Sequence, residues 1–178
     1  MLKLIILDID GVLTDGKKYY DRDGNVVLKN FCDKDWTAIK RFRSLGVDIF
    51  FITGDPFNAK ILDNRNLPYI VNRGKGFHND KVNFLNTILE KFKVTTDETL
   101  YLGDDVFDVN IMQSVKYKFC PADAPAIVKN ISNVLTGNGG ENLIKELFDF
   151  LQENQIIKTE NFEDEITKIY DLDIRESF

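Results

Sequence analysis

Residues 3–15, KLIILDIDGVLTD, decide the fold of this chain and point to its chemistry. Residues 4–7 form an uninterrupted apolar run, which is typical of a strand that is buried on both faces. Asp8 and Asp10 follow at the end of this strand, and Gly11 lets the backbone pass close to a ligand. One carboxylate in such a position can attack phosphorus and form an aspartyl-phosphate, while the second lies beside the leaving oxygen. The same residues also fit a surface turn after a core strand, so the rest of the chain must decide.

The composition indicates one soluble domain with a full core, since 43% of the 178 residues are hydrophobic and 29% are charged. No apolar run approaches the roughly 20 residues of a membrane span, and strand-like residues begin where a signal peptide would carry its charged region. We therefore expect a cytoplasmic protein without a membrane partner. Cys32 and Cys120 lie far apart and lack C-x-x-C spacing, which predicts free thiols rather than a disulfide or a zinc site.

The net charge of −6 disfavours a nucleic-acid partner, which requires clustered lysine and arginine. Much of the acidic excess lies in residues 158–178, where seven acids stand against three bases. We predict one domain over residues 1–155 and an acidic tail over residues 156–178 that is solvated by default. A short amphipathic helix that docks on its own domain or on a partner stays open, because apolar residues of the tail recur at helical spacing. They are Phe162, Ile166, Ile169 and Tyr170.

Strand-like and helical segments alternate through the predicted domain. Strands are expected at residues 4–7, 47–53, 69–71, 99–102, 116–120 and 133–136, and helices at residues 33–45, 57–65, 106–114 and 141–153, from residue 79 and after Pro125. This alternation predicts an α/β fold with a doubly wound, Rossmann-like parallel sheet between helices. Ligands of such folds bind beyond the carboxyl ends of the strands.

Residues 17–31, KKYYDRDGNVVLKNF, predict a β-hairpin inserted after the first strand. Tyr19 and Tyr20 would pair with residues 26–28 across Asp23-Gly24, a strong signal for a two-residue turn. The hairpin is too short to be a cap domain, so we predict no cap. Because phosphoryl transfer benefits from the exclusion of water, something else should then cover the site.

Polar residues suited to chemistry stand at three further strand or helix ends. Thr53 and Gly54 end a strand, Lys81 opens a helix, and three aspartates follow the strand at residues 99–102. We expect all of them to face the crevice that holds Asp8. Each alone has an ordinary explanation, as a turn, a solvated lysine or a capped helix start, but all of them in this order are hard to explain as accident. The three aspartates are Asp104, Asp105 and Asp108.

A phosphate monoester would give each of these groups a separate duty. The Thr53 hydroxyl and backbone N–H groups beyond Gly54 can bind phosphoryl oxygens, and Lys81 can offset the charge on the phosphoryl group. So many carboxylates would repel one another without a cation, which makes a metal an electrostatic expectation. The hard oxygen ligands suited to Mg²⁺ would be Asp8, the carbonyl of Asp10 and Asp104, with Asp105 as an additional candidate.

The loop RGKGFHNDK at residues 73–81 holds His78, the only histidine, which excludes a multi-histidine metal site. His78 fits a solvated loop residue or a substrate contact better than a catalyst. Arg73 and Lys75 could meet an anionic substrate, although solvated loop cations are at least as common.

The chain resembles the haloacid dehalogenase superfamily over roughly residues 1–150. The matching motifs are DIDGVLTD, ITG, the position of Lys81, and GDDVFD. The likeness is greatest to the capless branch of 3-deoxy-D-manno-octulosonate 8-phosphate phosphatases and related nonulosonate 9-phosphate phosphatases. That branch is indicated by DGVLTDG with its immediate hairpin, the Asp80-Lys81 pair, PADA, and the late pair Gly139-Gly140.

The resemblance implies a Mg²⁺-dependent phosphatase of a small sugar phosphate. Asp8 would be the nucleophile and Asp10 the general acid and then base, and Mg²⁺ would be held by Asp8, Asp10 and Asp104. Thr53, Gly54 and Lys81 would bind phosphate, while Asp105 and Asp108 would support the metal ligands. In that family a neighbouring subunit covers the site, and the hairpins assemble a homotetramer.

The chain departs from these relatives at positions that affect charge. They usually follow ITG with arginine and carry GGxGAxRE near the end, whereas this chain has Asp55 in ITGDP and Glu141-Asn142 in GGENLIKE, with Lys145 retaining positive charge. Such like charges disfavour a substrate carboxylate. We therefore predict a less acidic or amino-bearing sugar phosphate as the preferred substrate.

Two other classes of function stay open. A receiver-type signalling module also uses acids, threonine, lysine and Mg²⁺, but its phosphoacceptor ends a middle strand, where Asp48 and Asp63 are poorly placed. A catalytically idle structural partner could retain the fold, although intact Asp8 and Asp10 argue against it. Release of phosphate from small monoesters separates all three.

Overall fold

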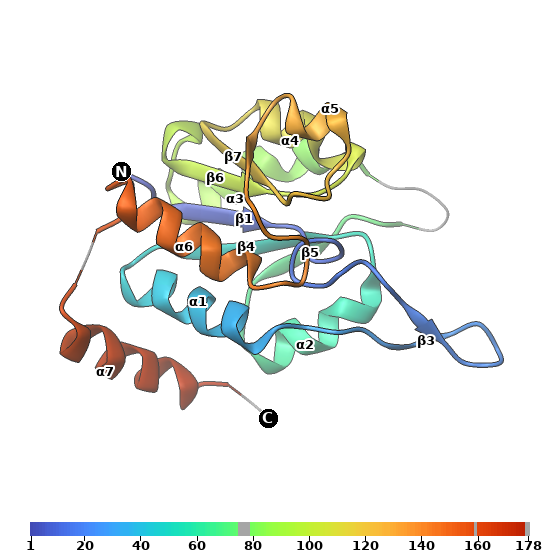
Figure 1. Cartoon of the computed structure of the whole chain (residues 1–178), viewed down its shortest axis with the longest axis horizontal. Helices are drawn as coiled ribbons and strands as arrows, with labels where there is room; N and C mark the ends of the chain where they lie inside the picture. Colours follow the sequence, from blue (N-terminus) through green and yellow to red (C-terminus); the bar gives the residue numbers. More distant parts are fainter. Residues whose placement is uncertain (75–78, 159, 177–178) are drawn as a thin grey trace.

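A parallel six-stranded sheet forms the centre of the computed structural model, which describes residues 1–74, 79–158 and 160–176 (Figure 1). The strand order is β5-β4-β1-β6-β7-β8, with β1 flanked by β4 and β6. The strands are β1 (Leu4–Leu7), β4 (Asp48–Thr53), β5 (Tyr69–Val71), β6 (Thr99–Leu102), β7 (Tyr117–Cys120) and β8 (Asn133–Val134). The predicted doubly wound α/β fold is therefore confirmed, and the carboxyl ends of β1, β4 and β6 lie side by side.

Helices cover both faces of this sheet. Alternate residues of β1 face opposite layers: Ile5 and Leu7 belong to the core under α1 and α6, and Leu4 and Ile6 to the core under α3 and α4. All four side chains are fully buried, as the apolar run predicts. The helices are α1 (Asp33–Ser44), α2 (Ala59–Asn64), α3 (Leu85–Phe92), α4 (Val109–Gln113), α5 (Ala126–Lys129), α6 (Leu143–Glu153) and α7 (Phe162–Asp173). None of the helices in the described part of the chain is long and apolar enough to span a bilayer.

Short 3-10 helices stand where several helices were expected to begin. They are η1 (Pro56–Asn58), η2 (Lys81–Phe84) and η4 (Val106–Asp108), and a further 3-10 helix, η3 (Thr96–Glu98), directly precedes β6. The helix expected from residue 79 starts as η2, because the Asp80 side chain accepts a hydrogen bond from the Val82 N–H at 3.2 Å and caps it. This tight turn fixes Lys81 at the edge of the sheet.

The predicted hairpin is present as β2 (Tyr19–Tyr20) and β3 (Val26–Leu28), and it is the only sheet structure between β1 and α1 in the described residues. No cap domain is inserted there. The turn is longer than the two residues predicted, because Asp21 accepts hydrogen bonds from the N–H groups of Asp23 and Asn25 at 2.9 and 2.8 Å. Apolar side chains on both strands are more than half exposed; they are Tyr19, Tyr20, Val27 and Leu28.

The late glycine pair packs against the loop that follows β1. A Cβ atom at Gly139 would lie 2.1 Å from the Gly11 carbonyl oxygen, and one at Gly140 would lie 2.6 Å from the Asp15 nitrogen. Gly140 N–H donates to the Val12 carbonyl at 2.9 Å. These two positions need glycine because any side chain would push the segment before α6 away from the loop that carries Asp10.

The acidic tail forms helix α7, which docks on α1 of its own domain rather than remaining solvated (Figure 1). Ile169 is buried, and Glu165 pairs with Arg41. The tail also reaches α2, since Glu176 pairs with Arg65 at 3.1 Å. Of the four apolar residues at helical spacing, Ile169 is buried and Ile166 is partly buried, whereas Phe162 and Tyr170 are exposed, so only part of the predicted apolar face is covered by the intramolecular contact.

Candidate active site

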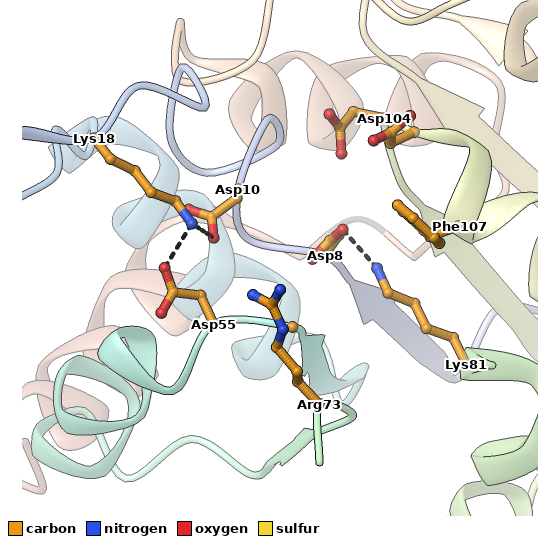
Figure 2. Close-up of a pocket in the computed structure, with 10 residues that line it drawn as sticks. Asp8, Asp10, Lys18, Asp55, Arg73, Lys81, Asp104 and Phe107 are labelled. Carbon is orange, nitrogen blue, oxygen red and sulfur yellow. Dashed lines mark hydrogen bonds and ion pairs between the residues drawn. The ribbon is translucent and has the colours of Figure 1, made fainter. Parts of the chain in front are cut away.

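A buried ion triad lies at the carboxyl end of the sheet. Lys81 Nζ donates to Asp8 Oδ2 and to Asp108 Oδ1, both at 2.6 Å, and all three side chains are buried (Figure 2). Asp108 also accepts from the Tyr101 hydroxyl at 2.6 Å and from the N–H groups of Asp104 and residue 105. The triad therefore ties the end of β1 to η2 and η4.

A pocket opens beside this triad. Figure 2 shows the side chains of Asp8, Lys81 and Arg73 converging on it from three different segments. Most of the predicted site residues line it, and Lys18, Asp55 and Phe107 join them. The lining consists of Asp8, Asp10, Lys18, Gly54, Asp55, Arg73, Lys81, Asp104, Asp105 and Phe107.

Several predicted residues lie outside this lining. Thr53 is fully buried, and its hydroxyl accepts hydrogen bonds from Asn58 Nδ2 at 2.8 Å and the Asp55 N–H at 3.2 Å. These hydrogen bonds hold the loop that follows β4. Asp108 is fully buried and does not line the pocket, and its supporting role stays a prediction. Lys75 and His78 lie outside the described residues.

The carboxylates of this site fit a divalent cation. Asp104 Oδ1 is buried without a hydrogen-bond partner, and carboxylate oxygens of Asp8, Asp104 and Asp108 lie within 4.8 Å of one another. A Cβ atom at Gly11 would lie 2.0 Å from Asp104 Oδ2, so glycine is needed for this approach. Because the oxygens of Asp108 are engaged by other groups, Asp8 and Asp104 are the carboxylates with capacity left for a metal.

The pKa values of these residues show that crowding the carboxylates together is unfavourable. Burial, with Asp8 and Asp108 nearby, raises the pKa of Asp104 from 3.8 to about 8. Burial also raises the pKa of Asp8 to about 6, against the opposing effect of Lys81. Burial alone would lower the pKa of Lys81, but Asp8 and Asp108 outweigh it and raise that pKa. A cation beside Asp104 would keep both pocket carboxylates ionised at neutral pH.

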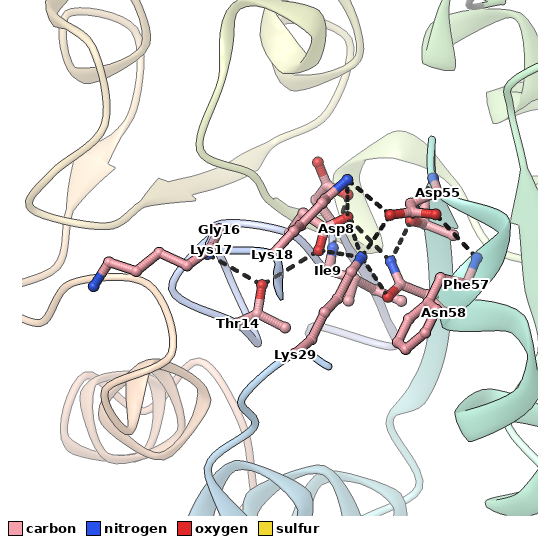
Figure 3. Close-up of polar contacts among 12 residues, drawn as sticks. Asp8, Ile9, Thr14, Gly16, Lys17, Lys18, Lys29, Asp55, Phe57 and Asn58 are labelled. Atoms are coloured by element: carbon pink, nitrogen blue, oxygen red, sulfur yellow. Dashed lines mark hydrogen bonds and ion pairs between the residues drawn. The ribbon is translucent and has the colours of Figure 1, made fainter. Parts of the chain in front are cut away.

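Asp10 lies outside that carboxylate group and belongs to a second polar network, which sequence reasoning missed. Figure 3 shows other members of this network, Lys18, Lys29, Asp55 and Asn58. Lys29 Nζ donates to Asp10 Oδ1 and Oδ2 at 2.6 and 2.8 Å, and Asn58 Nδ2 donates to Asp10 Oδ2 at 3.2 Å. Lys18 pairs with Asp55 at 2.7 Å and lies 3.8 Å from Asp10. The signal in the sequence was a lysine directly before β2 and another directly after β3, at the two ends of the hairpin.

The two departures in charge occupy different places. Asp55 lines the pocket and pairs with Lys18 and Lys29. Burial would raise the pKa of Asp55, but the hydrogen bonds from these lysines outweigh it and hold that pKa well below its usual range. Glu141 is exposed, accepts a hydrogen bond from Asn138 at 3.2 Å, and is absent from the lining. Of the two positions that differ in charge from the relatives, Asp55 is therefore the one whose side chain can contact a ligand in the pocket.

Comparisons with known proteins agree with this fold. The family model described as haloacid dehalogenase-like hydrolase matches residues 76–148. The 3-deoxy-D-manno-octulosonate 8-phosphate phosphatase of Haemophilus influenzae is 32% identical over 159 residues, which are 86% of this chain and 84% of that protein.

Two solved structures extend the likeness. The cobalt-bound deoxy-D-mannose-octulosonate 8-phosphate phosphatase from Haemophilus influenzae has a TM-score of 0.77 and 29% identity, and covers 86% of this chain and 89% of its own. A structure assigned to the haloacid dehalogenase superfamily, subfamily III A, from Legionella pneumophila has a TM-score of 0.81 and 25% identity, with 96% and 90% covered.

The raised pKa of Asp104 predicts that this carboxylate destabilises the metal-free protein. Its cost grows from about pH 4, where the carboxyl of the unfolded chain ionises, to about pH 8, where that of the folded chain does. In excess chelator at pH 8 we expect Asp104→Asn to raise the free energy of unfolding by about 2 kcal/mol or more, and by less at pH 5. Denaturant titrations at both pH values measure this difference.

The same variant tests the metal site without an activity assay. Mg²⁺ should raise the melting temperature of the wild-type protein and leave that of Asp104→Asn unchanged. Asp97→Asn, which alters an exposed aspartate outside the pocket lining, is the matched control and should keep the full shift. Equal Mg²⁺ shifts for wild type and Asp104→Asn would show that the cation binds elsewhere.

Proposed function

Because the chain belongs to the haloacid dehalogenase-like hydrolases, in the family of the 3-deoxy-D-manno-octulosonate 8-phosphate phosphatases, we propose that it cleaves its sugar phosphate with Mg²⁺ and an aspartyl-phosphate intermediate. The substrate would be of the octulosonate or nonulosonate type, or a less acidic relative. The observation that carries the proposal is the position of Asp8. This residue lines the pocket, and its Oδ2 accepts a hydrogen bond from Lys81 Nζ at 2.6 Å. This holds a carboxylate oriented toward a ligand.

The chemistry would proceed in two steps. An oxygen of Asp8 attacks phosphorus, and the bond from phosphorus to the sugar oxygen breaks while Asp10 gives that oxygen a proton. Asp10 then takes a proton from a water molecule that attacks the phosphorus of phospho-Asp8, which releases phosphate and restores Asp8. Backbone N–H groups after Gly54 and the ammonium of Lys81 would bind the phosphoryl oxygens.

Mg²⁺ is the proposed cation because the residues that face it offer oxygen alone. Asp8 and Asp104 would hold it, together with Asp10 as the sequence predicts. When bound, it supplies charge neutralisation for the phosphoryl group and for the crowded carboxylates. A divalent ion is consistent with the cobalt in the structure of the Haemophilus influenzae phosphatase.

Asp8→Asn should abolish turnover and keep the fold, because the amide is almost isosteric but a far weaker nucleophile. Loss of a nucleophile commonly costs a factor of about 10² or more in kcat. Phosphate release from p-nitrophenyl phosphate, with circular dichroism as the folding control, measures both.

Wild-type turnover should also stop in excess chelator and return with Mg²⁺. Near-normal turnover of Asp8→Asn, or undiminished turnover in chelator, would contradict the mechanism.

The preferred substrate remains a prediction that depends on Asp55. Lys18 is committed to Asp55 at 2.7 Å, so this lysine is not free for a substrate carboxylate. Arg73 lines the pocket and forms no ion pair with any residue in the described ranges, which leaves it available to a ligand. A carboxylate that reached Arg73 would also meet the charge of Asp55, and this favours a neutral or amino-bearing sugar phosphate.

Comparison of kcat/KM values for the octulosonate 8-phosphate and for neutral and amino-sugar phosphates tests this preference. We expect the octulosonate to be poorer by about tenfold, which corresponds to one like-charge contact of about 1.4 kcal/mol. Asp55→Asn should narrow the difference, whereas the control Glu141→Gln should leave it unchanged. A clear wild-type preference for the octulosonate would show that Asp55 does not set specificity.

We propose a homotetramer assembled by the hairpins, on the ground of the family resemblance. The exposed apolar side chains of β2 and β3 support it, because a monomer would leave them in water. A neighbouring subunit could also exclude water from a site that has no cap. Light scattering of the purified protein should give the mass of four chains, and Tyr20→Lys with Leu28→Lys should reduce it. A monomeric wild type would overturn the proposed assembly.

A further inference from the structure

Lys29 brings a buried positive charge into the site from the base of the hairpin. It directly follows β3, and its side chain is 0% exposed (Figure 3). A buried ammonium is costly unless it is paired and hydrogen-bonded. The partners of Lys29 are both carboxylate oxygens of Asp10, the Asp55 carboxylate at 2.8 Å and the Asn58 side-chain oxygen at 2.9 Å.

Burial decides what Lys29 can act on. It is absent from the pocket lining, whereas Asp10, Asp55 and the partly exposed Lys18 are part of it. A substrate in the pocket would therefore meet Asp10 and not Lys29. Any effect of Lys29 on the reaction has to pass through the carboxylates that it binds.

Asp10 is held from several directions at once. Lys29 contacts both of its oxygens, Asn58 donates to Oδ2 at 3.2 Å, and Thr14 Oγ1 donates to Oδ1 at 3.3 Å. These contacts resist rotation of the carboxylate about its terminal torsion, which is otherwise broad. A general acid works only within hydrogen-bond reach of the leaving oxygen, so small displacements are costly.

We propose that Lys29 is the positioning residue for Asp10, with Asp55 and Asn58 holding Lys29 in turn. The proposal rests on the acid and base role of Asp10 in the proposed function. It makes the base of the hairpin part of the catalytic apparatus, since the chain leaves the site before β2 and returns to it with Lys29 after β3.

The leaving group of the substrate distinguishes positioning from a structural role. p-Nitrophenolate leaves without much help from an acid, whereas a sugar or glycerol alkoxide requires protonation. The ratio kcat/KM reports the steps through formation of phospho-Asp8, which include protonation of the leaving oxygen. Loss of positioning should therefore affect an alkyl phosphate much more than p-nitrophenyl phosphate, whereas a loosened fold would affect both alike.

The experiment compares Lys29→Met with the control Lys17→Met, whose lysine stands at the start of the same insertion but points into solvent (Figure 3). For Lys29→Met we expect kcat/KM to fall about 10²-fold with glycerol phosphate and about tenfold or less with p-nitrophenyl phosphate. Asp10→Asn should show the same pattern, and Lys17→Met should stay within about twofold of wild type. An equal loss on both substrates, or no loss, would overturn the proposal.

A double variant tests whether Lys29 acts through Asp10. Adding Lys29→Met to Asp10→Asn should cost less than about threefold further in kcat/KM for glycerol phosphate, where Lys29→Met alone costs about 10²-fold, because the group to be positioned is already lost. Full additivity would overturn the proposal. If Lys29→Met does not fold, as thermal denaturation will show, Lys29→Arg keeps the charge and is judged by the same ratio between the two substrates.

These measurements also separate this inference from the proposed function. If wild type releases phosphate and Asp8→Asn does not, but Lys29→Met lacks the dependence on the leaving group, the inference alone fails. If wild type releases no phosphate or Asp8→Asn remains active, the proposed function fails, and the positioning role fails with it.

Discussion

The structure of the site depends on the salt bridges that Lys81 makes with Asp8 and Asp108. Three buried charges are tolerated only when they are paired at close range and hydrogen-bonded, and both distances here are 2.6 Å. The pairing joins the end of β1 to η2 and η4, segments that are far apart in the sequence. Asp8 still lines the pocket, with Oδ2 held by Lys81 and Oδ1 accepting a hydrogen bond from the Ile9 N–H at 2.7 Å, so the contacts that hold the fold together there also orient the proposed nucleophile.

The same triad leaves Asp104 without compensation. Lys81 is already shared by two carboxylates, so a further, partly buried carboxylate near Asp8 raises the electrostatic free energy of the folded state. A protein under selection for stability alone would have little use for this residue, whereas a site that must hold a cation requires it. Asp104 thus lowers the free energy of unfolding of the metal-free protein, and the same carboxylate would contribute affinity for the metal. Asp10 is treated differently, because the hairpin supplies Lys29 to it as a permanent partner.

The sequence predicted the parts of this site that follow from local pattern. Buried strands can be recognised in the sequence as apolar runs, and parallel strands place their carboxyl ends at one edge of the sheet. The sequence therefore predicted that Asp8, Gly54, Lys81 and Asp104 lie close together. The roles of Lys29 and Asn58 could not be predicted, because they depend on how the hairpin returns to the sheet. The hydrogen bonds that the Thr53 hydroxyl accepts from Asn58 and Asp55 were not predicted either, and its contact with a phosphate stays a prediction. The longer turn at Asp21 and the docked tail also depend on side-chain contacts that composition does not reveal.

The proposed mechanism requires Asp8 to carry the phosphoryl group between the two steps. The Asp10→Asn variant should slow hydrolysis of the intermediate, so it is the form in which the intermediate accumulates. Acid quenching of this variant during turnover of a ³²P-labelled phosphate ester, followed by peptide mapping, measures the label directly. We predict a hydroxylamine-labile phosphoryl group on the peptide that contains Asp8. This label should be absent from the double variant that carries Asp8→Asn in addition to Asp10→Asn. Turnover without any label on the chain, or a label that persists in the Asp8→Asn protein, would contradict the proposed mechanism.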